Sequence, residues 1–110
     1  MSNNSNNDFS IADILSLDKI IHEPVRFAIL SVLSVVEEAD FLFIMNKLEL
    51  TQGNLSSHLK KLEETGYIEI RKTYKGKRPL TIVKISETGR NEYIKYVNYL
   101  RNITDNLPYD

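Results

Sequence analysis

The segment from Thr51 to Lys61 carries a row of side chains suited to contact with a nucleic acid. Gln and Asn can pair bidentately with adenine, and Ser can hydrogen-bond to several bases. Lysines one turn later suit phosphates, which fix the register of a complex without reading sequence. The candidate base readers are Gln52, Asn54, Ser56 and Ser57, and the candidate phosphate contacts are Lys60 and Lys61. Contact with double-stranded DNA requires that one helix present them together.

The spacing of leucines in this segment predicts such a helix. Leu55, Leu59 and Leu62 form a narrow apolar stripe, with Thr51 placed to cap the start and Gly66 to end the helix in the left-handed conformation. At 100° per residue, the small and basic side chains then lie on or near the opposite face. A polar face is more often only solvated, so this helix alone does not establish a binding surface.

A basic hairpin follows the predicted helix. The β-rich runs 67–74 and 79–85 are separated by "KGKR", which predicts a turn, and Pro79 favours the start of an edge strand. From Arg71 to Lys84 there are six basic residues and no acidic one, whereas a solvated hairpin normally mixes signs. The candidate DNA contacts of the hairpin are Lys72, Lys75, Lys77 and Arg78. Helix and hairpin therefore predict one continuous phosphate-facing surface.

The formal net charge of −1 conceals a strong asymmetry along the chain. Residues 60–84 hold eight basic and three acidic residues, a net charge of +5, and the remainder holds six basic and twelve acidic residues, a net charge of −6. Positive charge confined to one region indicates an electrostatic footprint for an anionic partner.

The preceding residues predict the helices that position the polar segment. Pro24 suits a helix start, and an apolar helix is expected to run to Ala39 with Val25, Ile29, Val32 and Val36 on one stripe. Asp40 is expected to cap a short helix over 41–48, which makes 40–65 a helix-turn-helix candidate. A further short helix, capped by Ser10, is expected to reach about Leu17 and to serve packing or dimer contact.

A final helix is predicted over 87–107, capped by Ser86. Its apolar stripe repeats at three- and four-residue steps and is expected to have little core left to cover in a small domain, so a partner helix is the simplest surface for it to pack against. The expected dimer-interface residues are Tyr93, Tyr96, Val97, Leu100, Ile103 and Leu107.

The composition argues against several classes of site. Cysteine is absent, and the two histidines, His22 and His58, lie far apart in sequence, so no metal site, cofactor site or cysteine nucleophile is expected. Adjacent acidic pairs such as Glu63 and Glu64 point about 100° apart on a helix and do not converge as acid and base. An enzyme is not expected. No signal peptide or membrane span is evident, and we expect a cytoplasmic protein with a flexible tail over 1–9.

The order of these elements resembles winged helix-turn-helix transcriptional regulators of the MarR and ArsR type, and most closely the small archaeal and bacterial winged-helix DNA-binding domain family. The likeness rests on "HEPVRFAILSVL", "LTQGNLSSHLKKLEETGYI", "KGKRPLT" and "ISETGR", which lie between His22 and Arg90. It implies a homodimer, with the helix 51–65 in the major groove and the hairpin, or wing, on the adjacent minor groove or backbone. The resemblance also implies that a small aromatic effector could bind near Tyr93, Tyr96 and Tyr99. Dimer packing is the favoured role for these tyrosines.

The expected fold class is α+β, mainly α with a small antiparallel hairpin: a winged helix-turn-helix with an added C-terminal dimerisation helix. The winged-helix unit is expected over 10–86, with the wing at about 67–85, and the helix 87–107 as part of the same domain. The expected function is sequence-specific regulation of transcription by a homodimer on a pseudo-palindromic operator. The alternative is a winged-helix protein-interaction module whose wing binds an acidic protein.

Overall fold

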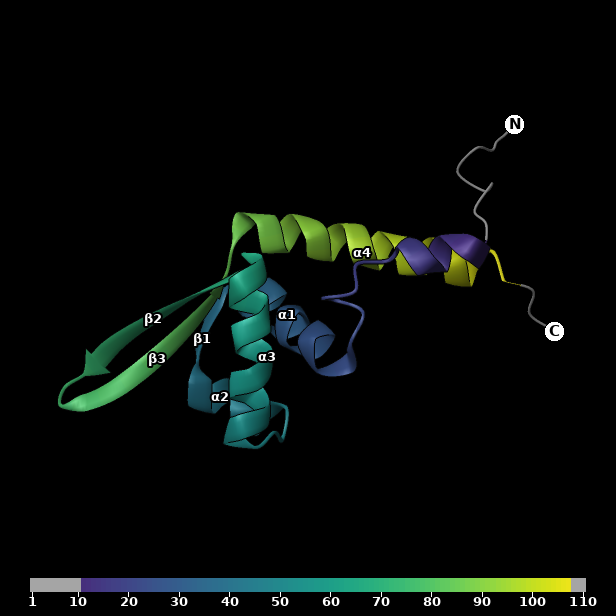
Figure 1. Cartoon of the computed structure of the whole chain (residues 1–110). Coiled ribbons are helices and arrows are strands. Elements are labelled where there is room, and N and C mark those ends of the chain that lie inside the picture. The colour runs from purple at the N-terminus through teal and green to yellow at the C-terminus, as the bar shows by residue number, and fades with distance from the viewer. Residues whose placement is uncertain (1–10, 108–110) are drawn as a thin grey trace.

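A computed structural model describes residues 11–107 and confirms the α+β fold class (Figure 1). The elements follow in the order η2 (Ile11–Ser16), α1 (Pro24–Val36), β1 (Glu38–Asp40), α2 (Phe41–Lys47), α3 (Gln52–Thr65), β2 (Ile68–Lys75), β3 (Arg78–Ile85) and α4 (Glu87–Asp105). Ser10 and the tail 1–9 lie outside the described residues, so the predicted cap of the first helix is not addressed. Among residues 11–107, none of the helices has the length and apolar content required to cross a membrane.

The predicted caps of the later helices are confirmed. The Asp40 and Thr51 side chains accept hydrogen bonds from the backbone N–H groups of Leu42 and Asn54. Ser86 accepts in the same way from the N–H of Gly89. Gly66 ends α3 with a φ of 86°. These local bonds explain why α2, α3 and α4 begin where the sequence indicates.

The predicted extension of α1 to Ala39 is wrong. The helix ends at Val36, because Glu37 adopts a φ of 69° and the chain enters the short strand β1. Val36 is consequently 43% exposed rather than part of the core stripe. Only pairing with β3 makes residues 38–40 a strand, so the local sequence carried no signal for it.

The sheet has the strand order β1-β3-β2, and both pairings are antiparallel. The expectation of an edge strand at Pro79 is therefore wrong for β3 as a whole, since β3 is central. Pro79 pairs with Tyr74, whereas β1 reaches only Ile82 to Lys84, so at the level of Pro79 the strand has one neighbour. The hairpin turn is two residues long and places Gly76 at a φ of 65°, a backbone conformation that favours glycine.

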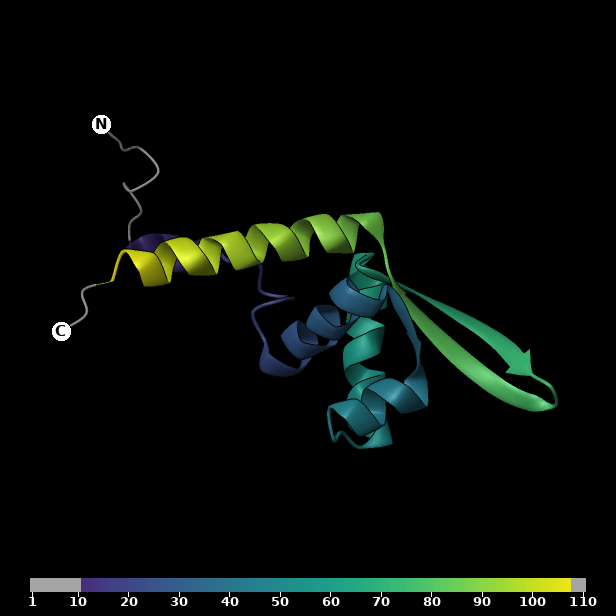
Figure 2. The ribbon, with the colours of Figure 1, turned by 180° about the vertical axis from the view of Figure 1, so that it is seen from behind.

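The core lies where α1 crosses α3, α4 and the base of the wing. Its fully buried side chains include Ile29, Leu30 and Leu33 of α1 together with Leu55 and Leu62 of α3. The wing projects from one side of this core, and α4 extends from the other, with η2 beside its C-terminal half (Figures 1 and 2).

Candidate nucleic-acid interface

The leucine stripe and the polar face of α3 are placed as predicted. Leu55 and Leu62 are fully buried and Leu59 is 2% exposed. The six predicted contact residues of this helix are all exposed, and we call them the polar face of α3: Gln52, Asn54, Ser56, Ser57, Lys60 and Lys61. Exposure leaves their contact with DNA a prediction.

The polar face divides into two edges. Gln52, Ser56 and Lys60 line a groove that is closed on its other side by Lys72 of β2 and Thr81 of β3. The remaining members of that groove are Phe41, Leu59, Glu63 and Ile70. Helical geometry places Asn54, Ser57 and Lys61 on the outward side and on the edge away from the wing. A strand of DNA backbone in the groove would therefore meet Lys60 on the α3 wall and Lys72 on the wing wall.

The wing presents its cations in two groups. Lys75, Lys77 and Arg78 are exposed at the hairpin tip, and Lys72 is exposed nearer the base. Arg71 lies on the other face of β2, with its Nη2 3.6 Å from an Oε2 of Glu38, so this pair does not belong to the groove.

Tyr74 is a candidate contact that the sequence reasoning missed. Side chains alternate along a strand, so Tyr74 shares a sheet face with Ile70 and Lys72, both of which line the groove beside α3. Its side chain is 71% exposed. The period-2 alternation of "IEIRKTY", counted from the buried Ile68, was the available signal.

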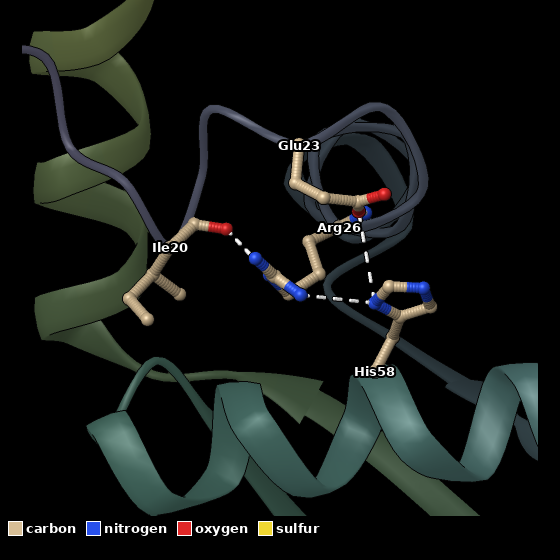
Figure 3. Close-up of polar contacts among 4 residues, drawn as sticks. All are labelled: Ile20, Glu23, Arg26 and His58. Carbon is tan, nitrogen blue, oxygen red and sulfur yellow. Dashed lines mark hydrogen bonds and ion pairs between the residues drawn. The ribbon is translucent and has the colours of Figure 1, made fainter.

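His58 is turned toward the core side of α3 and joins a polar cluster with α1 (Figure 3). Its Nδ1 accepts a hydrogen bond from Nη1 of Arg26 at 3.1 Å and lies 3.6 Å from Oε1 of Glu23. That carboxylate oxygen also accepts from the backbone N–H of Arg26 at 2.7 Å, which caps α1. Nε of Arg26 donates to the carbonyl of Ile20 at 2.6 Å. His58 thus has a packing role and is not part of the polar face.

The segment 17–23, which we call the connector, is bonded to several elements at once. Oδ1 of Asp18 accepts from the N–H groups of Ile20 and Ile21, and the Tyr67 hydroxyl donates to Oδ2 of Asp18 at 2.5 Å. Nδ1 of His22 is 2.6 Å from the hydroxyl of Tyr96 on α4. Burial, the hydrogen bond to Asp18 and nearby carboxylates raise the pKa of Tyr67. Burial and the charge of Asp18 likewise raise the pKa of Tyr96.

The expectation that α4 finds little core within the chain is wrong. Tyr96 is 5% exposed and Ile103 is 8% exposed in the single chain. The Tyr93 hydroxyl is 2.8 Å from Oγ of Ser31, and the rings of Tyr93 and Tyr96 pack against Phe27. Val97 and Leu100 are half-buried and Leu107 is exposed. Much of the predicted dimer stripe therefore packs within its own chain, because η2 and α1 cover it.

Apolar side chains remain exposed at the end of the α4 and η2 arm. Leu15 of η2 is 80% exposed, Leu107 is 37% exposed, and Ile94 in the middle of α4 is 50% exposed.

No group of three or more His, Cys, Asp or Glu side chains within residues 11–107 is arranged to hold a metal ion.

A family model described as "Winged helix DNA-binding domain" matches residues 25–104. The chain is also 39% identical over 89 residues to an uncharacterized protein of Methanocaldococcus jannaschii, an alignment that covers 81% of this chain and 97% of that protein.

Among solved structures, the chain is similar to a transcriptional regulator homologue protein from Pyrococcus horikoshii OT3. That match has a TM-score of 0.84 at 32% identity and covers 90% of this chain and all of the other. The transcriptional regulator BldR from Sulfolobus solfataricus matches with a TM-score of 0.59 at 23% identity, over 86% of this chain and 63% of BldR, which is a likeness of fold.

Proposed function

Because this chain belongs to the winged helix DNA-binding domain family, we propose that it is a transcriptional regulator that binds double-stranded DNA as a homodimer on a pseudo-palindromic operator. The fold is shared with the transcriptional regulator BldR, and the similar protein from Pyrococcus horikoshii, which is named a transcriptional regulator homologue, supports this proposal. So does the geometry of α3 and the wing.

The observation that carries the proposal is the continuity of one polar and cationic surface. The polar face of α3 is exposed beside a groove whose opposite wall is the wing. We propose that α3 enters the major groove, with Asn54 and Ser57 against base edges and Lys60 and Lys61 against phosphates.

In this arrangement the wing follows the DNA backbone away from α3. Lys72 would meet the same strand as Lys60, and Lys75, Lys77 and Arg78 would meet the flanking backbone or minor groove. We add Tyr74 to this set, since an exposed ring among cations suits contact with sugars or base edges.

We propose that the homodimer forms through the arm of η2 and α4. Tyr96 and Ile103 are covered in the single chain, so the interface would centre on Leu15 and Leu107, with Val97, Leu100 and Ile94 contributing their exposed parts. The winged-helix unit, residues 10–86, and the helix 87–107 would then form one domain. The first part would bind DNA and the second would form the dimer.

Two of the tyrosines considered for a small aromatic effector already have partners within the chain. The Tyr93 and Tyr96 hydroxyls already bond to Ser31 and His22, and their rings pack on Phe27. These contacts support an internal packing role for Tyr93 and Tyr96, although Tyr96 also lines a pocket with His22 and Phe27, so the effector stays a prediction.

Selection of binding sites from random duplexes, followed by gel shifts at low and physiological salt, tests the function. We expect Ser57→Ala to weaken the selected site by roughly 1 to 3 kcal/mol per lost base contact and to leave random duplexes unaffected. Lys77→Ala should weaken all duplexes and flatten the salt dependence.

Equal losses on all sequences from both variants would contradict the role of α3 as the base reader. If no duplex binds even at low salt, and an acidic partner protein is captured instead, the protein-interaction alternative replaces DNA binding.

A further inference from the structure

Arg26 lies in the first turn of α1 and uses two edges of its guanidinium on two different segments (Figure 3). Nε donates to the carbonyl of Ile20 in the connector at 2.6 Å, and Nη1 donates to Nδ1 of His58 on α3 at 3.1 Å. The Arg26 side chain thus links the connector to α3. Neither contact involves the polar face of α3.

The chemistry of this bridge is restrictive. A guanidinium has donors only, so Nδ1 of His58 must present its lone pair and carry no proton. Glu23, which also has only acceptors when ionised, then makes no hydrogen bond to that nitrogen and instead caps α1. The planar fork of arginine can reach two separate acceptors, whereas the single ammonium of lysine is a point charge without that fork.

We propose that Arg26 is a positioning residue that fixes the rotation of α3 about its axis and thereby the aim of the base-reading side chains. This inference rests on the proposed function. Burial of Leu55, Leu59 and Leu62 turns this stripe of α3 inward, but these contacts are non-directional and constrain small rotations about that orientation less sharply than a directional bond does. The bond to His58 is directional, and it is made on the edge of α3 that also carries Asn54 and Lys61.

The other end of the bridge is itself anchored. Asp18 holds the N–H of Ile20 and accepts from Tyr67 at the base of the wing. His22 is bonded to Tyr96 of α4. Arg26 therefore fixes the orientation of α3 relative to both the wing and α4. Binding to two operator half-sites at a fixed spacing requires such a fixed orientation.

Two pairs of variants test the bridge, each measured as the ratio of affinity for a selected duplex to affinity for a random duplex. Arg26→Met keeps the stem and removes the donors, and Arg26→Lys keeps the charge and removes the fork. We expect both to lower the ratio about tenfold, the size of a lost base contact, with random-duplex affinity nearly unchanged. His58→Gln retains an acceptor and should keep most of the ratio, whereas His58→Leu should resemble Arg26→Met.

The double variant Arg26→Met with His58→Leu should lose no more than Arg26→Met alone, because Arg26→Met already breaks the bond to His58. Thermal unfolding of every variant, with binding measured well below its midpoint, separates positioning from loss of folding. If one variant fails to fold, the His58 pair and the Arg26 pair each test the bond independently.

If the wild type binds DNA, three outcomes would overturn the inference. Wild-type behaviour of Arg26→Lys would assign Arg26 a charge role toward phosphates. If Arg26→Met and His58→Leu leave the ratio of selected to random affinity unchanged, the bridge has no influence on sequence recognition. Parallel losses on selected and random duplexes would make it a purely structural contact. Failure of the wild type to bind any duplex would instead refute the proposed function, and this inference with it.

Discussion

Gly53 and the two serines give the outward side of α3 little side-chain bulk, which lets a helix approach base edges closely. A Cβ built on Gly53 would meet nothing within 4 Å among residues 11–107, so an added methyl is accommodated by this part of the fold. Any obstacle to Gly53→Ala must therefore come from a partner.

We expect Gly53→Ala to raise the free energy of unfolding by up to about 1 kcal/mol, because alanine favours helix. The same change should weaken the selected duplex, because the methyl group occupies the space next to the bases. Denaturant unfolding and gel shifts measure the two effects on one protein. Unchanged or tighter specific binding would place Gly53 away from the interface.

Tyr67 and Tyr96 make the stability sensitive to alkaline pH. Their pKa values are raised in the folded chain, mainly by burial, so the folded state retains protons that the unfolded state releases above its tyrosine pKa of about 10. Their contribution is fully present below pH 10 and is lost as the pH rises further, by at most about 1.4 kcal/mol per pH unit for each tyrosine. Urea unfolding at pH 8 to 11 measures this loss of stability. The variant Tyr67→Phe should show a smaller decrease in the free energy of unfolding per pH unit. An equal decrease in that variant would contradict the assignment.

At the scale of elements, the joint between α3, the wing and α4 is made by backbone rather than by large side chains. Gly89 is buried in the first turn of α4, and a Cβ there would clash with the carbonyl oxygen of Tyr67. The Ser86 hydroxyl donates to the carbonyl of Gly66 at 2.6 Å and accepts from the N–H of Gly89. The start of α4 is thus held against the point where α3 ends and the wing begins.

We expect Gly89→Ala to lower the free energy of unfolding by roughly 1 to 3 kcal/mol or more, because backbone atoms must move apart to admit the methyl group. Thr88→Ala, at the exposed neighbouring position of α4, is the matched control and should change stability little. Circular dichroism during thermal unfolding measures both. Similar stability of the two variants would show that the joint is more yielding than its geometry indicates.

The whole molecule is elongated. Its radius of gyration is 16.8 Å, whereas a compact chain of this length would have a value of about 13 Å. The wing and the α4 arm account for this, since they leave the core on different sides (Figure 1). An arm with exposed Leu15 and Leu107 at its end is the surface on which we base the dimer.

We expect the double variant Leu15→Asp with Leu107→Asp to be monomeric and to bind the operator weakly, because each chain then reaches only one half-site. Val35→Asp is the control, since Val35 is 82% exposed at the end of α1, outside the arm. Light scattering gives the masses. Equal masses for wild type and double variant would remove the arm from the dimer proposal.

The sequence by itself determined the caps of α2, α3 and α4, the wing and the leucine stripe that turns the polar face of α3 outward. Each of these depends on residues close together in the chain, such as Thr51 with Asn54, or on the three- and four-residue spacing of Leu55, Leu59 and Leu62. Local hydrogen bonds and periodic burial leave a signature that can be read without the fold.

Only the tertiary structure decided the strand β1, the burial of Tyr96 and Ile103, and the bridge from Arg26 to His58. β1 exists through pairing with β3, and Arg26 and His58 are separated by 32 residues. Contacts between distant segments depend on how helices cross and on which surface covers which, and no local spacing encodes that. The surface that we propose to face DNA was therefore visible in the sequence, whereas the contacts that hold α3 at its angle were not.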